Sequence, residues 1–201
     1  MFYEPQKRNH GLPHDPFKAI VAPRPIGWIT SISARGEVNL APYSFFNAVS
    51  THPPIVLFAS EGAKDSKTFI EETGEFVCNL ATFELRDAMN ATSAPLPRGR
   101  NEMEAAGLAA APSRLVKPPR VAASPCALEC RWLQTLALRD TNGKQLENFV
   151  VFGQVIGIHI DERFIREGLL DIAAMRPIAR CGYQDYAVVE QVFAMTRPNG
   201  G

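Results

Sequence analysis

The first third of the chain alternates between short apolar segments and tight turns. Residues 26–33 have the period-two pattern of a strand, with Trp28 on one face and small side chains on much of the other. The glycine in residues 35–37 predicts a hairpin turn, after which residues 38–44 return as a second strand. The continuous apolar run at residues 53–60 predicts a strand that is buried on both faces.

Helical patterns are short and fall between the predicted strands. Residues 15–18 place Asp before Pro, which matches an N-cap followed by the first helical position. A second helix is predicted to open at residues 64–66 and to end at a glycine, Gly74, in the C′ position. Further helices are predicted at residues 84–94, 102–108 and 162–175.

Long strands dominate the second half of the chain. Residues 126–140 and 148–161 predict two strands whose connecting turn contains the Asn-Gly pair typical of a hairpin. Further strands are predicted at residues 75–81 and 182–195. The Pro-, Ala- and Arg-rich residues 95–119 form a long connection, and such connections are often binding loops or lids. Strands joined by tight turns favour an antiparallel barrel or sandwich.

Composition and charge narrow the possible functions. The chain has 201 residues, 46% of them hydrophobic, which suits a single domain with a sizeable core. Its 21 basic residues balance 21 acidic ones, so no net field attracts nucleic acid or an anionic membrane. Apolar runs stay short of the roughly 20 residues that span a bilayer. Residues 1–14, an N-terminal arm, lack the apolar core of a signal peptide, so we expect a cytoplasmic protein.

Common catalytic and redox motifs are missing. The sequence has no G-x-S-x-G elbow, no phosphate-binding P-loop and no G-x-G-x-x-G fingerprint. Cys126 and Cys130 lie on one predicted strand, where their Cα atoms are about 13 Å apart, too far for a disulfide. We therefore expect the four cysteines to be buried, reduced thiols, and we expect any redox chemistry to come from a cofactor.

The histidines offer no evident metal site. His10 and His14 have the spacing of a helical metal pair, but Pro13 between them disfavours that helix, so both are interpreted as solvated. His52 precedes two prolines and is either a loop or capping residue or one that lines a site. His159 lies in an alternating strand and is expected to face solvent or a subunit contact.

Small hydrogen-bonding residues and one cationic segment suit a flat, anionic cofactor. Such a cofactor needs backbone or hydroxyl donors for its ring edge, small side chains that leave room for the ring, and a positive pocket for its phosphate. The first two are supplied by residues that are small or hydrogen-bonding: Thr30, Ser31, Asn47, Ala48, Val49 and Ser50. Residues 60–67, SEGAKDSK, place a lysine and a Ser/Asp pair at a predicted helix N-terminus, where anions bind. The alternative is that Asp65 or Ser66 is a plain N-cap.

Several short motifs follow one another in a characteristic order over residues 15–190. They are PRPI at 23–26, TS at 30–31, NLAPYS at 39–44, FNAVS at 46–50, PP at 53–54, KDS at 64–66, EFVCN at 75–79, SP at 124–125, EC at 129–130, GQV at 153–155 and RCGY at 180–183 with Tyr186. In this order and spacing the chain resembles the flavin reductase-like FMN-binding proteins.

The resemblance implies both a fold and a cofactor. The fold is mainly β, a six-stranded antiparallel Greek-key split barrel with short peripheral helices, in one domain over residues 1–201. The cofactor is FMN at a homodimer interface, reduced at flavin N5 by hydride from NAD(P)H, with no catalytic side chain. The implied FMN contacts are Thr30, Ser31, Asn47, Ala48, Val49 and Ser50 at the ring and ribityl chain, Ser60, Lys64, Asp65 and Ser66 at the phosphate, and Arg24 as an added positive charge.

Three functional hypotheses remain open at this stage. The first is an NAD(P)H-dependent flavin reductase, which could pass electrons to a partner protein. The second is an FMN-binding electron carrier or sensor that does not turn over NAD(P)H, and the third is a flavin-free dimeric binding module. Short flavin reductases usually carry a histidine just before the strand that matches residues 150–155, where this chain has Glu147, Asn148 and Phe149.

Overall fold

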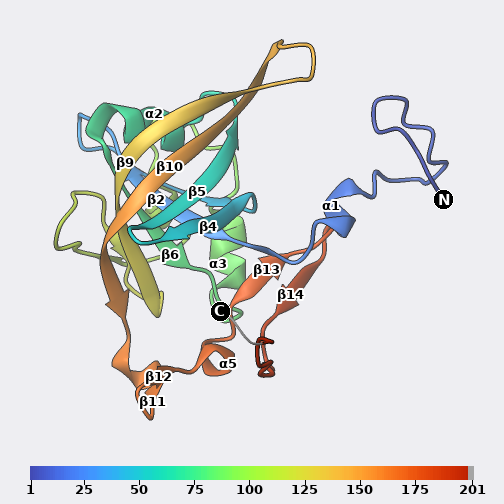
Figure 1. Cartoon of the computed structure of the whole chain (residues 1–201). Helices are drawn as coiled ribbons and strands as arrows, with labels where there is room; N and C mark the ends of the chain where they lie inside the picture. Colours follow the sequence, from blue (N-terminus) through green and yellow to red (C-terminus); the bar gives the residue numbers. More distant parts are fainter. Residues whose placement is uncertain (199–201) are drawn as a thin grey trace.

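The computed structural model describes residues 1–198, and its centre is a seven-stranded antiparallel sheet (Figure 1). Neighbouring strands follow the order β3-β2-β6-β9-β10-β5-β4. Their bounds are Gly27–Ile32 for β2, Val38–Tyr43 for β3, Phe46–Thr51 for β4, Pro54–Glu61 for β5, Glu75–Leu80 for β6, Cys126–Arg139 for β9 and Gln145–Ile160 for β10. The mainly β, antiparallel split-barrel class predicted from the sequence is confirmed.

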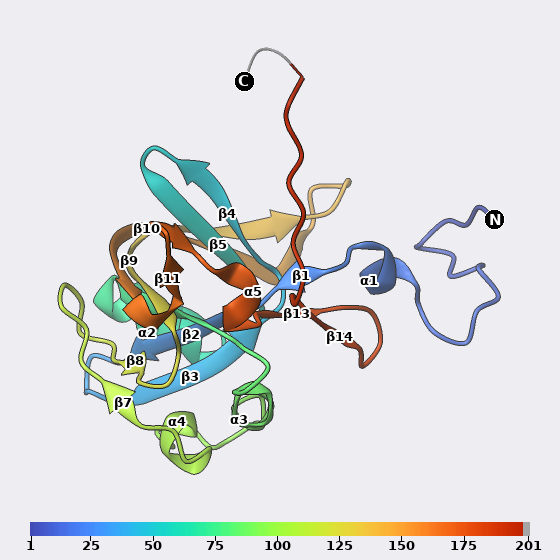
Figure 2. The same cartoon turned by 90° about the horizontal axis from the view of Figure 1, so that it is seen from below.

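Smaller elements surround this sheet. The remaining strands are β1 (Arg24–Pro25), β13 (Ile178–Arg180) and β14 (Tyr186–Val188) in one sheet, β7 (Ala110–Ala111) with β8 (Arg120–Val121), and β11 (Ile165–Arg166) with β12 (Leu169–Leu170). The α-helices are α1 (Phe17–Ile20), α2 (Asp65–Thr73), α3 (Arg86–Ala91), α4 (Glu102–Ala105) and α5 (Ile172–Met175). Figure 2 shows the N-terminal arm and the C-terminal segment leading away from the barrel.

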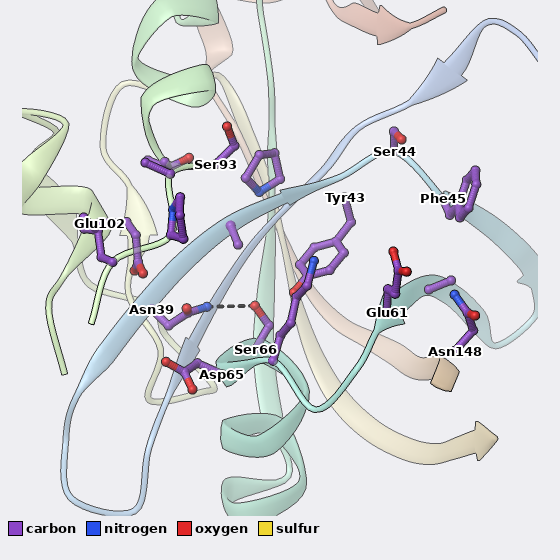
Figure 3. Close-up of a pocket in the computed structure, with 18 residues that line it drawn as sticks. Asn39, Tyr43, Ser44, Phe45, Glu61, Asp65, Ser66, Ser93, Glu102 and Asn148 are labelled. Atoms are coloured by element: carbon purple, nitrogen blue, oxygen red, sulfur yellow. Dashed lines mark hydrogen bonds between the residues drawn. The ribbon is translucent and has the colours of Figure 1, made fainter. Parts of the chain in front are cut away.

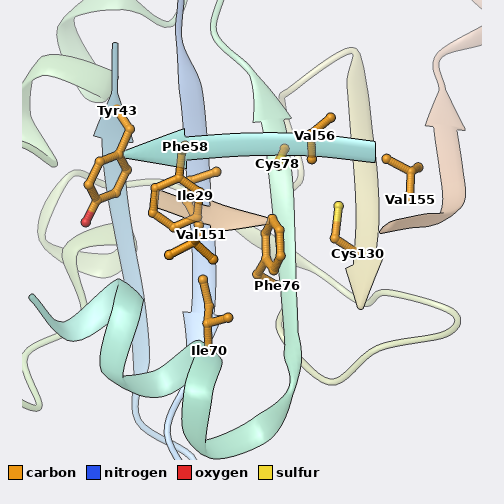
Figure 4. Packing of buried hydrophobic residues seen from close by; sticks show 10 residues of the cluster. All are labelled: Ile29, Tyr43, Val56, Phe58, Ile70, Phe76, Cys78, Cys130, Val151 and Val155. Carbon is orange, nitrogen blue, oxygen red and sulfur yellow. The ribbon is translucent and has the colours of Figure 1, made fainter. Parts of the chain in front are cut away.

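One hydrophobic cluster fills the inside of the curled sheet. Figure 4 shows β5 crossing β2, β3 and β6, with Ile29, Phe58 and Phe76 packed between these strands. These three side chains are fully buried, and Ile70 of α2 packs against the same cluster. Gly153 of β10 is required here, because a Cβ at this position would lie 2.2 Å from Cζ of Phe76. A side chain at position 153 would therefore have to displace the Phe76 ring from the core.

A second cluster covers the opposite face of β2 and β3. Trp28 and Leu40 are fully buried there and pack with Met89 of α3 and Met103 of α4. The indole N–H of Trp28 donates to Oγ1 of Thr92 at 2.9 Å, which ties the chain just after α3 to β2. Strand β2 is therefore buried on both faces, and the two helices hold the following chain beside β3.

Local signals in the sequence predicted several element boundaries correctly. Helix α2 ends at Gly74, which adopts a left-handed conformation with φ 73° and donates its N–H to the carbonyl of Ile70 at 2.7 Å. The β9–β10 hairpin turns at residues 140–144, where Asp140 Oδ1 accepts from two backbone N–H groups. All four cysteines are free thiols, but only Cys78 and Cys130 are buried as expected, whereas Cys126 and Cys181 are half-buried.

Other predictions are wrong in detail. The sheet has seven strands rather than six. Residues 46–51 follow β3 in the chain but pair with β5, which makes them an additional edge strand. Strand β5 is fully buried on one face only, with its buried and half-buried residues alternating. The predicted helix at 162–175 is broken into a 3-10 turn, the β11–β12 hairpin and α5, since Gly168 adopts a positive φ of 80°. Of the predicted strand at 182–195, only β14 finds a neighbouring strand.

Candidate functional site

A cavity of about 540 Å³ opens between β3, the start of α2 and the chain that follows α3 (Figure 3). Alternate residues of β3, Asn39, Ala41 and Tyr43, line it from one side. Residues 64–66 line it from the start of α2, and residues 92–96 line it from the chain after α3. Its volume falls within the range of about 300–1,000 Å³ that is usual for small-molecule sites.

The N-terminal end of α2 meets this cavity with its first N–H groups uncapped. Lys64 occupies the N-cap position in an extended conformation, and its side chain makes no capping hydrogen bond. In an α-helix the first N–H groups have no acceptor within the helix, so those of residues 65–67 need a partner from outside it. These N–H groups and the positive end of the helix dipole favour an anion.

Two buried hydroxyls lie beside this helix end. The Ser66 side chain accepts a hydrogen bond from Nδ2 of Asn39 at 2.7 Å, drawn as the dashed line in Figure 3. The Tyr43 hydroxyl faces Ser60 and Ser66 but makes no hydrogen bond of ordinary geometry, although it is buried. Burial raises the pKa of Tyr43, so the phenol keeps its proton and can donate it. An unpaired buried donor beside a cavity fits a polar ligand.

Acidic side chains outnumber basic ones around the cavity. Among the described residues that line it, Lys64 carries the positive charge, whereas Glu61, Asp65 and Glu102 are acidic. Glu102 accepts from the backbone N–H of Leu40 at 3.0 Å, and burial raises the pKa of its carboxyl. Asp65 forms an ion pair with Arg98, whose Nη2 lies 2.7 Å from its Oδ1.

The structure brings some of the predicted phosphate-binding residues together. Lys64, Asp65 and Ser66 line the cavity side by side. Ser60 is buried nearby at the end of β5, and its hydroxyl donates to the carbonyl of Gly62 at 3.3 Å. Among these four predicted residues, only the Ser60 side chain donates a hydrogen bond to a backbone carbonyl.

The predicted ring-binding residues of β2 lie behind the wall of the cavity. Thr30 and Ser31 are fully buried and are not among the residues that line it. Thr30 Oγ1 accepts from Nδ2 of Asn79 at 2.9 Å, and Ser31 Oγ accepts from Asn39 at 3.4 Å. In this chain, Ser31 therefore supports Asn39, which in turn holds Ser66.

The other predicted residues lie away from this cavity. Asn47, Ala48, Val49 and Ser50 belong to the edge strand β4, and the first three are exposed. Arg24 is buried, and its guanidinium donates to the carbonyls of Lys18, Val21 and Cys181. Arg24 thus joins the N-terminal segment to the loop after β13, at a place outside the cavity lining.

Sequence reasoning missed several residues that line the cavity. Asn39 and Tyr43 could have been found, because the period of two on β3 places them on one face and both are polar in an apolar strand. Ser93, Leu96 and Glu102 come from the chain after α3, and only tertiary packing brings that segment to β3.

One histidine has a buried partner that the sequence did not reveal. His159 is half-buried rather than open to solvent, and its Nε2 bonds to Oε1 of the fully buried Glu129; the subunit contact stays a prediction. The other hydrogen bonds of Glu129 come from the backbone N–H groups of Arg114 and Leu115, at 2.7 and 2.6 Å. Within residues 1–198, no cluster of His, Cys, Asp and Glu side chains is suited to a metal ion.

Comparison with known proteins places the chain in a family. Residues 21–176 match the family model described as the flavin reductase-like domain. An uncharacterized protein of Halalkalibacterium halodurans is 32% identical over 183 residues, covering 89% of this chain and 87% of its own length. Nitrilotriacetate monooxygenase component B of Bacillus cereus has a TM-score of 0.88 at 26% identity, covering 97% of this chain and 98% of that one.

A second solved structure agrees with this assignment. The 2-nitrobenzoate 2-nitroreductase of Pseudomonas fluorescens has a TM-score of 0.84 at 26% identity, covering 99% of this chain and 97% of that one. The fold, the cavity and the family match together define a flavin-related oxidoreductase. The chain belongs to the flavin reductase-like domain family, as the order of its motifs predicted. In the described part of the chain, no helix is both long and apolar enough to span a membrane.

Proposed function

We propose that this protein is an FMN-dependent oxidoreductase that uses NAD(P)H as reductant, and that FMN binds in the cavity beside α2. The observation that carries the proposal is the uncapped start of α2, which opens into a cavity together with Lys64 and two buried hydroxyls. A phosphate group matches these donors in charge and in hydrogen-bonding capacity.

Each residue around the cavity has a distinct part in this proposal. Lys64 and the N–H groups of residues 65–67 bind the phosphate, and Ser66 donates its hydroxyl proton while Asn39 fixes its oxygen. Tyr43 supplies a further donor from the buried side. The small residues Ala41, Ala59 and Ala94 leave room for a flat ring. When bound, FMN supplies the two-electron redox chemistry that these side chains lack.

The first experiment separates the reductase from its main alternative. The protein is purified, loaded with FMN and titrated with NADH and with NADPH in the absence of oxygen and of any partner protein. Loss of the visible flavin absorption with either nucleotide is the expected result. A flavin spectrum that neither nucleotide bleaches would support the electron carrier or sensor instead, and a protein that binds no flavin would contradict both.

Substitutions at the start of α2 test where FMN binds. Lys64→Ala and Ser66→Ala should each weaken FMN binding by about tenfold or more, because each removes a contact to a charged phosphate. Lys144→Ala is the matched control, since Lys144 is exposed in the turn between β9 and β10 and does not line the cavity. Equal FMN affinities in all three variants and the parent, measured by flavin fluorescence, would rule out this phosphate site.

The quaternary state and the electron acceptor are part of the same proposal. Exposed apolar side chains, including Leu133 and Leu136 on β9 and Val49 on β4, support a homodimer. The exposed residues of β4 would then be available to a flavin bound by the other subunit. Because the similar Bacillus cereus protein is component B of a monooxygenase, a partner protein is the acceptor we favour. A monomer at micromolar concentration with FMN bound, seen by sedimentation, would contradict the homodimer.

A further inference from the structure

Carboxylates that line the cavity would repel the phosphate of a bound FMN. Asp65 is the first residue of α2, next to the N–H groups that would bind the anion. Asp65 and Glu102 both line the cavity. Burial raises the pKa of Glu102, and the negative charge of Asp65 raises it further. Negative charges at one site repel each other, and they do so more strongly where water is partly excluded.

Arg98 offsets this charge from outside the cavity lining. Its Nε donates to Oδ1 of Asp65 at 2.8 Å, and its Nη2 lies 2.7 Å from the same oxygen in an ion pair. Arg98 follows Pro95 and Leu96, which line the cavity, in an exposed stretch of chain. Arg100, two residues further on, is also exposed. It does not line this cavity, and it forms no ion pair among the described residues.

We propose that Arg98 sets the selectivity of the site for phosphorylated flavin over riboflavin by neutralising Asp65 at the start of α2. This inference rests on the proposed FMN site. Arg98 acts here as a positioning residue, since it works through Asp65 and does not line the cavity itself. The N–H of Asp65 remains available to the phosphate, whereas its carboxylate is held by the guanidinium.

The test compares FMN and riboflavin, which differ in the phosphate alone. Arg98→Gln keeps a side chain of similar shape without the charge, and it should weaken FMN binding about tenfold while riboflavin binding stays unchanged. Arg100→Gln is the matched control and should leave both affinities unchanged. In an Asp65→Asn background, Arg98→Gln should not weaken FMN binding further, because the Asp65 carboxylate that Arg98 neutralises is absent.

Distinct outcomes would overturn this inference. An unchanged FMN affinity in Arg98→Gln, or equal losses for FMN and riboflavin, would show that Arg98 does not act on the phosphate. A tenfold loss that persists in the Asp65→Asn background would show that it does not act through Asp65. A wild-type protein that binds neither flavin would instead refute the proposed function, so the two failures are distinguishable.

Discussion

The long connection between α3 and β9 has two segments that are held in opposite ways. Buried side chains of β6 and β9 bind the backbone N–H groups of the 114–121 segment. Glu129 accepts from Arg114 and Leu115, Glu75 from Lys117, and Asn79 from Val121 at 2.8 Å. The 93–100 segment is exposed except at Leu96, and the ion pair between Arg98 and Asp65 joins it to α2.

The 114–121 segment is fixed to the sheet, whereas the 93–100 segment lies next to the cavity. Arg114, Leu115 and Lys117 are exposed, but their N–H groups bond to carboxylates of the sheet, where a donor that is screened from water needs a partner in the protein. Side chains already buried in the sheet supply those partners. The 93–100 segment lines the cavity with residues 93–96, and the N–H groups of Ser93, Ala94 and Arg100 bond to carbonyls within the same stretch of chain, so fewer contacts fix this segment to the sheet.

The largest expected effect comes from removing a partner of the 114–121 segment. Glu129→Ala should lower the free energy of unfolding by about 3 kcal/mol, because it leaves two N–H groups and His159 without their acceptor. Denaturant unfolding measures this, and Glu167→Ala, at an exposed position, is the control. A loss below about 1 kcal/mol would mean that the segment is not fixed in this way.

A smaller effect is expected at Asn79, whose amide joins β6 to β2 and to the 114–121 segment. Its Nδ2 donates to the Trp28 carbonyl at 3.0 Å, and its Oδ1 accepts from Val121. Asn79→Ala should lower the free energy of unfolding by about 2 kcal/mol. Hydrogen exchange at Val121 should accelerate as well, and exchange that stays as slow as in the parent would contradict this contact.

Acid should weaken the same segment. Burial acts to raise the pKa of Glu129, but hydrogen bonds from His159 and from two backbone N–H groups outweigh it and hold the pKa below its usual range. Such a carboxyl stabilises the fold above its unfolded pKa, and that contribution is lost as pH falls through the folded value. Unfolding free energy should therefore drop below about pH 4.3, and less steeply in Glu129→Gln. Equal slopes would exclude Glu129 as the titrating group.

The smallest effect on stability is expected at the 93–100 segment. The Arg98 side chain is 61% exposed, and ion pairs of this kind contribute little to folding. Arg98→Gln should change the free energy of unfolding by less than about 0.5 kcal/mol, in contrast with its expected effect on FMN binding. Thermal unfolding checks this, and a loss as large as that of Glu129→Ala would remove the distinction between the two segments.

The sequence predicted what local patterns determine. Period-two alternation identified β2. The prediction of a helix at 162–175 was wrong because Glu167 and Gly168 both adopt a positive φ, which turns the chain back on itself between β11 and β12. A strand pattern after β14 failed because strands also need a neighbour, which no local pattern reveals.

The rest of the candidate site depends on contacts between distant residues. Thr30 and Ser31 have the right chemistry for a ligand, but Asn79 and Asn39 take up their hydroxyls from other strands. Arg98 met Asp65 only through the path of the chain after α3, which the packing of Met89 and Met103 against β2 and β3 sets. Such pairings require the register and the packing of the whole sheet.

The central claim is that the start of α2 binds the phosphate of FMN, and the affinities of the wild-type protein for FMN and riboflavin test it most directly. Both ligands present the same ring, so any difference reports on the phosphate contacts. We expect FMN to bind at least about tenfold more tightly, given the contribution of charge-assisted hydrogen bonds. Equal affinities for the two flavins would contradict the claim.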